Sequence, residues 1–96
     1  MDAKLLYSVK EMQGGFIRQM VVWHLQKPVP GCRHLFKYRF YFGTAAGVCL
    51  VRYDNERGKG DHIHLAGVER PYNFQGVKQL LADFDKDVQQ IMETNR

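Results

Sequence analysis

The segment RHLFKYRFYF, residues 33–42, constrains the fold of this chain more than any other stretch. Aromatic residues take alternate positions, and basic residues fill most positions between them. Because successive side chains of a strand point to opposite faces, this alternation predicts a β-strand with one aromatic and one basic face. The aromatic face consists of Phe36, Tyr38, Phe40 and Phe42, and the basic face of Arg33, Lys37 and Arg39. A second layer must cover the aromatic face.

Four further segments have the alternation and flanking turn residues of strands: residues 4–12, 16–26, 48–54 and 62–67. In residues 16–26, one side carries Ile17, Val21, Trp23 and Leu25, and the other carries Arg18 and His24. We interpret the apolar side as core and the basic side as surface. Cys49 lies in an apolar strand and is expected in the core, and both cysteines are expected to be free thiols.

Residues 74–94 change to a helical period. Their apolar stripe consists of Val77, Leu80, Leu81, Phe84, Val88, Ile91 and Met92. Asn73 is a suitable N-cap, and Asp83 and Asp87 are expected on the solvated side. The sequence therefore predicts one domain, residues 1–96, of the α+β class. It consists of an antiparallel sheet of four to five strands with one C-terminal helix packed on one face.

The charge of the chain is uneven. Residues 1–60 contain ten Lys and Arg against four Asp and Glu, whereas residues 61–96 contain four against six. Basic residues would lie on the sheet face that one helix leaves open: Arg18, His24, Arg33, Lys37, Arg39 and Arg52. Together with Tyr41, such a face suits a phosphate backbone with stacked bases, although it also suits solubility alone.

No segment is apolar for long enough to be a signal sequence or a membrane span. The longest apolar run, residues 45–51 with one glycine, is far shorter than the roughly 20 residues that a membrane helix needs. We therefore expect a soluble, cytoplasmic protein without a membrane partner.

The segment RYDNERGKGDHIHL, residues 52–65, gathers groups that transfer protons and bind phosphate. Cleavage of an RNA phosphodiester needs a base, an acid and cations near the phosphate oxygens. Imidazole titrates near neutral pH, so His62 and His64 are candidates for an acid–base pair, with Asp54 as the orienting group. Arg52 is a candidate for holding the phosphate in the catalytic site. Further substrate-binding candidates are Lys59, Arg57, Asn55, Lys37, Arg39 and Tyr53.

Other interpretations of this segment remain open. His62 and His64 share one side of a strand and could ligate a metal ion, with Asp54 or Asp61 as the third ligand. Because the chain contains no fixed metal-binding motif, we expect neither a metal nor another cofactor. The segment could also be a polar turn without a function.

Several short motifs follow one another along the chain: VVW at 21–23, PVPG at 28–31, RYDN followed by GKGDHIH at 52–64, PY at 71–72, and LL–DF at 80–84. This order resembles the TumE family of small prokaryotic toxins, and the resemblance covers nearly the whole chain. It implies the toxin of a type II toxin–antitoxin pair, whose antitoxin carries a helix-turn-helix or winged-helix DNA-binding domain. It identifies Arg52, Tyr53, Asp54, Asn55, Gly58, His62 and His64 as motif positions without assigning their roles.

The leading hypothesis is a toxin that cleaves RNA by metal-independent acid–base chemistry. One alternative is a non-enzymatic module that blocks a nucleic-acid or ribosomal target with its basic face. Another is that residues 52–65 dock the antitoxin. The oligomeric state is left open, a homodimer included.

Overall fold

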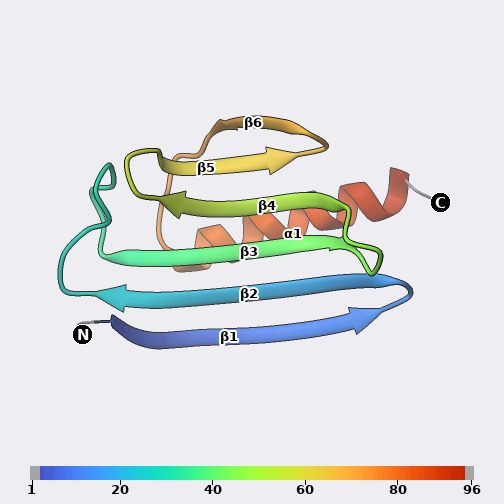
Figure 1. The fold of residues 1–96 in the computed structure, drawn as a ribbon, viewed down its shortest axis with the longest axis horizontal. Coiled ribbons are helices and arrows are strands. Elements are labelled where there is room, and N and C mark those ends of the chain that lie inside the picture. The colour runs from blue at the N-terminus through green and yellow to red at the C-terminus, as the bar shows by residue number, and fades with distance from the viewer. Residues whose placement is uncertain (1–2, 95–96) are drawn as a thin grey trace.

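The structure, a computed structural model, describes residues 3–94. It contains a single antiparallel sheet with one helix across its back (Figure 1). The elements are β1 (Ala3–Gln13), β2 (Phe16–Leu25), β3 (Phe36–Thr44), β4 (Cys49–Glu56), β5 (Gly60–Leu65), β6 (Val68–Pro71) and α1 (Val77–Thr94). Each strand pairs with the next one in the chain, in the order β1-β2-β3-β4-β5-β6.

The predicted fold class is confirmed, because one C-terminal helix packs on one face of an antiparallel sheet. The predicted number of strands is wrong, since the sheet has six strands rather than four to five. The additional strand is β6, whose four residues are too few to show an alternation and include a proline. It lies at the edge of the sheet, where Pro71 is tolerated.

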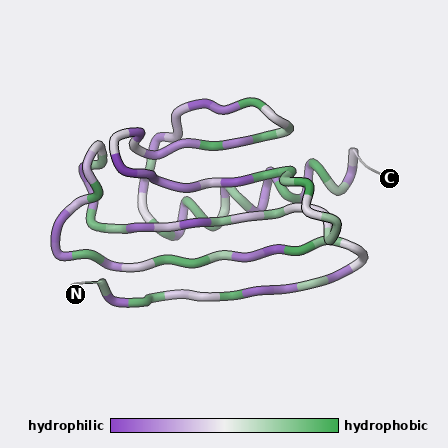
Figure 2. Tube along the Cα trace, in the orientation of Figure 1, coloured by the Kyte–Doolittle hydropathy of each residue, from purple (hydrophilic) through white to green (hydrophobic). Residues whose placement is uncertain are grey.

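The core lies between α1 and the middle strands, on the aromatic face of β3. Tyr38, Phe40 and Phe42 are buried as predicted. Phe84 of α1 packs edge-on against Phe40 and against Tyr53 of β4, with ring centroids 5.3 and 5.6 Å apart. Hydrophobic and hydrophilic residues alternate along these strands (Figure 2), so each middle strand has one side in the core.

The predicted orientation of β2 is wrong. Val22 and Met20 lie opposite Tyr38 and Phe40 and share their buried face, whereas Trp23 lies opposite Lys37 on the other face. Both alternating sets of β2 are largely apolar, so periodicity alone does not choose between them. Pairing with the aromatic side of β3 decides the register, because neighbouring residues of paired strands share a face.

Acidic residues of α1 bind tyrosines of the sheet and of the segment that follows it, instead of facing only solvent. Tyr53 Oη donates to the Asp87 carboxylate, and Tyr72 Oη donates to Asp83 Oδ2 at 2.5 Å. The predicted solvated role of these two aspartates is therefore wrong. Arg18, predicted on the open face, instead lies on the helix face as a consequence of the β2 orientation. Its Nη2 is 2.9 Å from an oxygen of Asp85.

The helix begins at Val77, so the predicted start at residue 74 with Asn73 as N-cap is wrong. Phe74 stacks on His34, with ring centroids 3.8 Å apart, and is partly buried against the core. This contact holds residue 74 in the connection from β6. Gly76 has a φ of +104°, outside the helical region, and its carbonyl accepts the amide of Leu80.

The two edge strands, β1 and β6, are the most exposed parts of the sheet. Every residue of β1 is exposed except Val9, which is partly buried. Cys49 is exposed rather than in the core, because β4 begins there beside a register shift opposite Gly43. Both cysteines are free thiols, as predicted. No helix among residues 3–94 has the length and apolar character needed to cross a bilayer.

The buried tyrosines predict a loss of stability at alkaline pH. Burial, together with the contacting carboxylates Asp61 and Asp87, raises the pKa of Tyr38 and Tyr53. Above about pH 10 tyrosines of the unfolded chain lose their protons while these two keep theirs, so the folded state binds more protons. The free energy of unfolding should fall by about 1.4 kcal/mol per pH unit for each tyrosine.

Urea denaturation between pH 9 and pH 11.5 measures this slope, and Tyr53→Phe should remove the contribution of one tyrosine. Tyr7→Phe, at an exposed position of β1, is the control and should leave the slope nearly unchanged. Equal slopes for Tyr53→Phe and the wild type would contradict the prediction.

Candidate functional site

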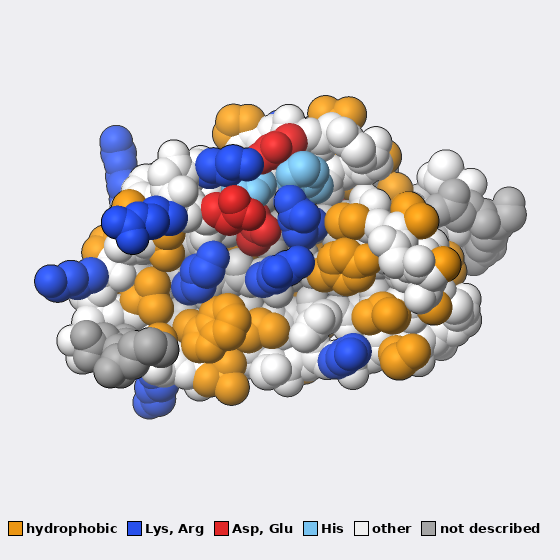
Figure 3. Space-filling view, in the orientation of Figure 1, with side chains coloured by type: hydrophobic (Ala, Val, Ile, Leu, Met, Phe, Trp, Pro, Cys, Tyr) orange, Lys and Arg blue, Asp and Glu red, His pale blue; other side chains and the backbone are white. Residues whose placement is uncertain are grey.

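The sheet face opposite α1 is left uncovered by the other described elements. Figure 3 views this face and shows histidine and acidic side chains together, with Lys and Arg around them and a hydrophobic area beside them. Two rows of cross-strand neighbours produce this grouping. The first row contains Arg39, Asp54 and His62, and the second contains Tyr41, Arg52, His64 and Glu69. The predicted juxtaposition of Arg52 and Asp54 with the two histidines is confirmed.

Four side chains form what we call the acid–imidazole cluster: Asp54, His62, His64 and Glu69. Asp54 Oδ1 lies 2.5 Å from His62 Nε2, and Glu69 Oε2 lies 3.3 Å from His64 Nε2. The other oxygen of Glu69 lies 3.7 Å from His62 Nε2. Two carboxylates and two imidazoles therefore converge on one small area where β4, β5 and β6 run side by side.

Sequence reasoning missed Glu69 because it missed β6. The signal was available in LAGV, residues 65–68, where two turn residues separate two apolar ones. Ala66 and Gly67 have φ angles of +50° and +84°, as a two-residue hairpin turn with two positive φ angles requires. This turn places Glu69 opposite His64.

His62 is held rigidly at the base of the cluster. Its relative exposure is 4%, and its Nδ1 lies 3.1 Å from the carbonyl oxygen of Gly60. Since a carbonyl only accepts, Nδ1 carries a proton, and a neutral His62 presents the lone pair of Nε2 to Asp54. Asp54 Oδ1 and His62 Nε2 are both buried, and neither has a hydrogen-bond partner of normal geometry among residues 3–94.

Cations surround the cluster on its exposed side. Arg52 Nε lies 3.3 Å from Asp54 Oδ2, and Lys59 Nζ lies 3.8 Å from Glu69 Oε1. Arg39 is exposed next to Asp54 in the register, and Arg57 is exposed in the turn between β4 and β5. Lys37 lies on the same face, with its Nζ donating to the backbone carbonyl of Asn55 at 2.6 Å.

The structure separates Tyr53 and Asn55 from this cluster. The Tyr53 side chain lies on the helix face, in the core. Asn55 is fully buried, and its side chain substitutes for backbone pairing where β4 leaves β3. Its Oδ1 accepts from Tyr38 N at 3.0 Å, and its Nδ2 donates to Phe36 O at 2.7 Å. Neither residue is available to a substrate on the open face.

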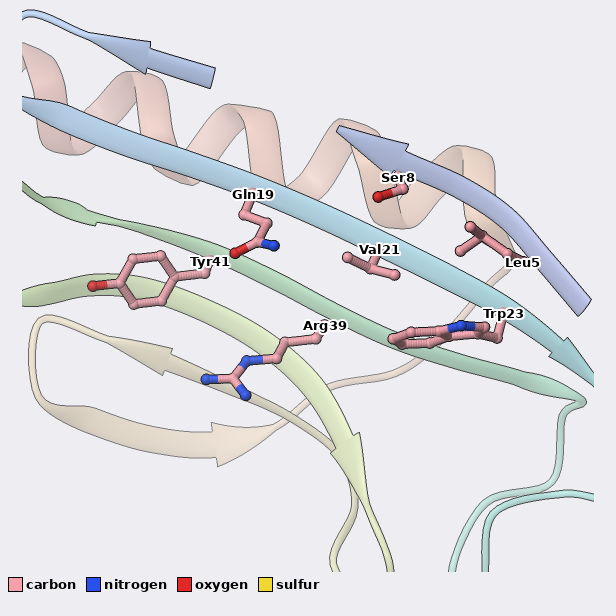
Figure 4. Close-up of a pocket in the computed structure, with 7 residues that line it drawn as sticks. All are labelled: Leu5, Ser8, Gln19, Val21, Trp23, Arg39 and Tyr41. Carbon is pink, nitrogen blue, oxygen red and sulfur yellow. The ribbon is translucent and has the colours of Figure 1, made fainter. Parts of the chain in front are cut away.

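A hollow of about 650 Å³ adjoins the cluster on the same face. Its lining comes from three strands: Leu5, Ser8, Gln19, Val21, Trp23, Arg39 and Tyr41. Figure 4 shows the flat Trp23 ring beside Val21 and the Arg39 side chain extending from β3 toward β4. We call this hollow the Trp23 groove. The sequence interpretation had placed Trp23 in the core, so it missed the groove.

A second group of reactive side chains, Cys32, His34 and Asp61, lies near the other side of the sheet. Phe36 N donates to His34 Nδ1 at 3.1 Å, so Nε2 carries the ring proton and donates to Asp61 Oδ1 at 2.8 Å. Burial, together with the Asp61 carboxylate, raises the pKa of the Cys32 thiol. A raised pKa disfavours the thiolate, so this group lacks an activated nucleophile.

The fold and this site can be compared with known proteins. A family model described as Toxin TumE matches residues 3–92, nearly the whole chain. No curated protein gives a significant match, and neither does any solved structure. The matched residues include all of the acid–imidazole cluster and all of the Trp23 groove.

Asn55 provides a test of the separation between structural and surface residues. In Asn55→Ala, the Tyr38 amide and the Phe36 carbonyl lose their partners in a buried place. The free energy of unfolding should fall by about 2–4 kcal/mol. Urea denaturation measures this change, and Gln89→Ala on the exposed side of α1 is the control, expected within about 0.5 kcal/mol of wild type. If Asn55→Ala were as stable as the wild type but failed to bind ligand, Asn55 would be a substrate-binding residue and the structural role would be contradicted.

Proposed function

The chain belongs to the TumE toxin family, and we propose that this toxin acts on RNA, binding a single strand across the open sheet face and cleaving it at the acid–imidazole cluster. Family membership makes it the toxin of a toxin–antitoxin system with an antitoxin partner. A type II pair, with a helix-turn-helix or winged-helix DNA-binding antitoxin, is part of the proposal.

The position of the Trp23 groove next to the cluster supports this proposal. Single-stranded nucleic acids bind where aromatic rings stack the bases and cations follow the phosphates. Trp23 and Tyr41 supply rings, and Arg39 lines the groove while lying next to Asp54 in the sheet register. A strand whose bases stack in the groove would therefore bring its next phosphate to Arg39, Arg52 and the cluster.

The exposed side of the cluster would meet the reacting phosphate. The side chains of His64 and Glu69 are 29% and 40% exposed, whereas that of His62 is 5% exposed. We therefore assign His62 and Asp54 to positioning, and not to direct contact with the substrate. This changes the hypothesis of two histidines acting as acid and base. Proton transfer falls to His64 or to a water that the cluster holds, with Arg52 and Arg39 beside the developing charge.

A non-enzymatic binder is the second candidate, favoured by the same groove and cations. It would use Trp23, Lys37 and Arg39 to block RNA or a ribosomal target, without cleavage. Docking of the antitoxin on residues 52–65 is a third candidate, in which substitutions there would release neutralisation and leave toxicity intact.

Paired substitutions separate binding from cleavage. His64→Ala should retain affinity for an RNA oligonucleotide, but its cleavage rate should fall at least about 100-fold, because a proton-transfer group typically accelerates a reaction by that factor or more. Arg39→Glu should weaken binding and make it less dependent on salt, because a phosphate contact is lost. Gel assays of cleavage, salt titrations of binding and growth after induction measure these effects.

His24→Ala is the control for His64→Ala, because His24 is exposed and lies away from the cluster. A folded His64→Ala protein that cleaves RNA and arrests growth as the wild type does would remove His64 from the mechanism. Arrest of growth by His64→Ala together with its abolition by Arg39→Glu would favour the non-enzymatic binder.

The groove makes a separate prediction. Trp23→Ala should weaken binding of single-stranded RNA by about 1–3 kcal/mol, the cost of removing one stacked base. Fluorescence anisotropy with a labelled oligonucleotide measures the change. Val68→Ala, at an exposed apolar position on β6, is the control and should bind normally. Unchanged affinity in Trp23→Ala would exclude the groove as the base-binding surface.

A further inference from the structure

We propose that His62, His64 and Glu69 bind one divalent transition-metal ion of the zinc class, with the Asp54 carboxylate beside it. The sequence alone favoured no metal, and its metal alternative lacked Glu69. The proposal concerns binding by the protein itself and goes beyond action on RNA.

The ligand atoms are close enough to share one ion. One nitrogen of each histidine and one oxygen of Glu69 all lie within 4.8 Å of one another. His64 Nε2 and His62 Nε2 lie 3.3 and 3.7 Å from their nearest Glu69 oxygens. Neighbouring ligands of a tetrahedral ion with bonds of about 2.0–2.2 Å lie roughly 3.3–3.6 Å apart. Small side-chain rotations would therefore complete the site.

The buried atoms at the base of the cluster are stable together only with a proton or a cation between them, and a metal ion would meet this need. Gly60 O fixes a proton of His62 on Nδ1, so in the neutral ring the lone pair of Nε2 faces Asp54 Oδ1, 2.5 Å away. Two lone pairs at this distance repel unless a proton or a cation lies with them. Both atoms are more than nine-tenths buried and lack a hydrogen-bond partner of normal geometry in the described part of the chain.

The surroundings of His62 match those of a metal-binding histidine. Such residues almost always donate their second ring N–H to a carbonyl or carboxylate, which fixes the ring. His62 does so toward Gly60 O. Arg52 contacts Asp54 through Oδ2, the oxygen that does not face His62, and so leaves Oδ1 directed into the cluster.

The ligand types indicate the class of metal. Two imidazoles and one carboxylate suit Zn²⁺, Co²⁺, Fe²⁺ or Mn²⁺, whereas Mg²⁺ and Ca²⁺ prefer oxygen ligands. Three protein ligands leave a fourth position for water or a substrate oxygen. That position would be reached from the open face, because His64 and Glu69 are the exposed members of the cluster. If RNA is the substrate, as proposed above, this position would hold a water or a phosphate oxygen, and proton transfer would then fall to the held water rather than to the metal-bound His64.

The group of Cys32, His34 and Asp61 is a competing site outside the cluster, and its hydrogen bonds disfavour it. His34 Nδ1 accepts from a backbone amide, so the nitrogen that faces Asp61 carries the proton and has no lone pair for a metal. His62 has the opposite arrangement, with its lone pair directed into the cluster. This contrast gives the experiment its control.

The test is calorimetric titration of metal-depleted protein with Zn²⁺ in the absence of RNA. One ion per chain should bind, and Glu69→Gln and His64→Asn should each weaken binding by at least about tenfold. Cys32→Ser should bind as the wild type does. With Co²⁺, the visible spectrum should show nitrogen and oxygen ligands without a thiolate-to-cobalt charge-transfer band. Thermal unfolding of the metal-free variants verifies that they remain folded.

Absence of Zn²⁺ binding by the wild type would overturn the proposal, as would binding that survives both cluster substitutions or is lost in Cys32→Ser. RNA assays keep this outcome separate from the proposed function. Cleavage that persists after chelation, by a protein that binds no Zn²⁺, would remove the ion and retain the activity on RNA. One Zn²⁺ bound at the cluster without any cleavage would retain the ion and remove the ribonuclease.

Discussion

A single helix covers one face of a sheet that is wider than the helix. Strands lie about 4.8 Å apart, so six of them span roughly 24 Å, whereas a helix with its side chains is about 10–12 Å wide. The helix therefore covers the middle of one face, where Phe84 meets Phe40 and Tyr53. Everything else follows from this mismatch: the aromatic core is narrow, the outer strands extend beyond it, and a whole face remains for polar chemistry.

The uneven charge of the chain partly reflects contacts that hold the helix on the sheet. Of the acidic residues after position 60, Asp83, Asp85 and Asp87 lie on the helix and contact two tyrosines and an arginine. These contacts use carboxylates on the covered face, while Arg39 and Arg52 lie on the other. The basic open face thus owes some of its character to where the acidic residues are placed, and total charge alone would not have located it.

The sequence predicts those parts of the structure in which the residue pattern is compatible with only one buried face. The aromatic alternation of β3 is compatible with only one, and it leads to the correct fold class. The alternation of β4 and β5 likewise places Arg52 and Asp54 opposite the two histidines. β2 has two largely apolar faces, and its own alternation does not show which of them is buried. Its pairing with β3 decides this. Glu69 depends on a four-residue strand with no pattern of its own. Asn55 looks like a ligand-binding amide in the sequence, and only the end of the β3–β4 ladder gives it a structural role.

The first strand has a consequence for the toxin outside its complex. β1 is eleven residues long, forms one border of the sheet and is exposed along almost its whole length. The backbone amides and carbonyls on its outer side are arranged for another strand to join them, and Leu5, Leu6 and Tyr7 are exposed there as well. Lys4, Lys10 and Glu11 are charges of the kind that discourage such joining. The free toxin thus has an open strand edge, and these three charged side chains oppose the pairing of another strand with it.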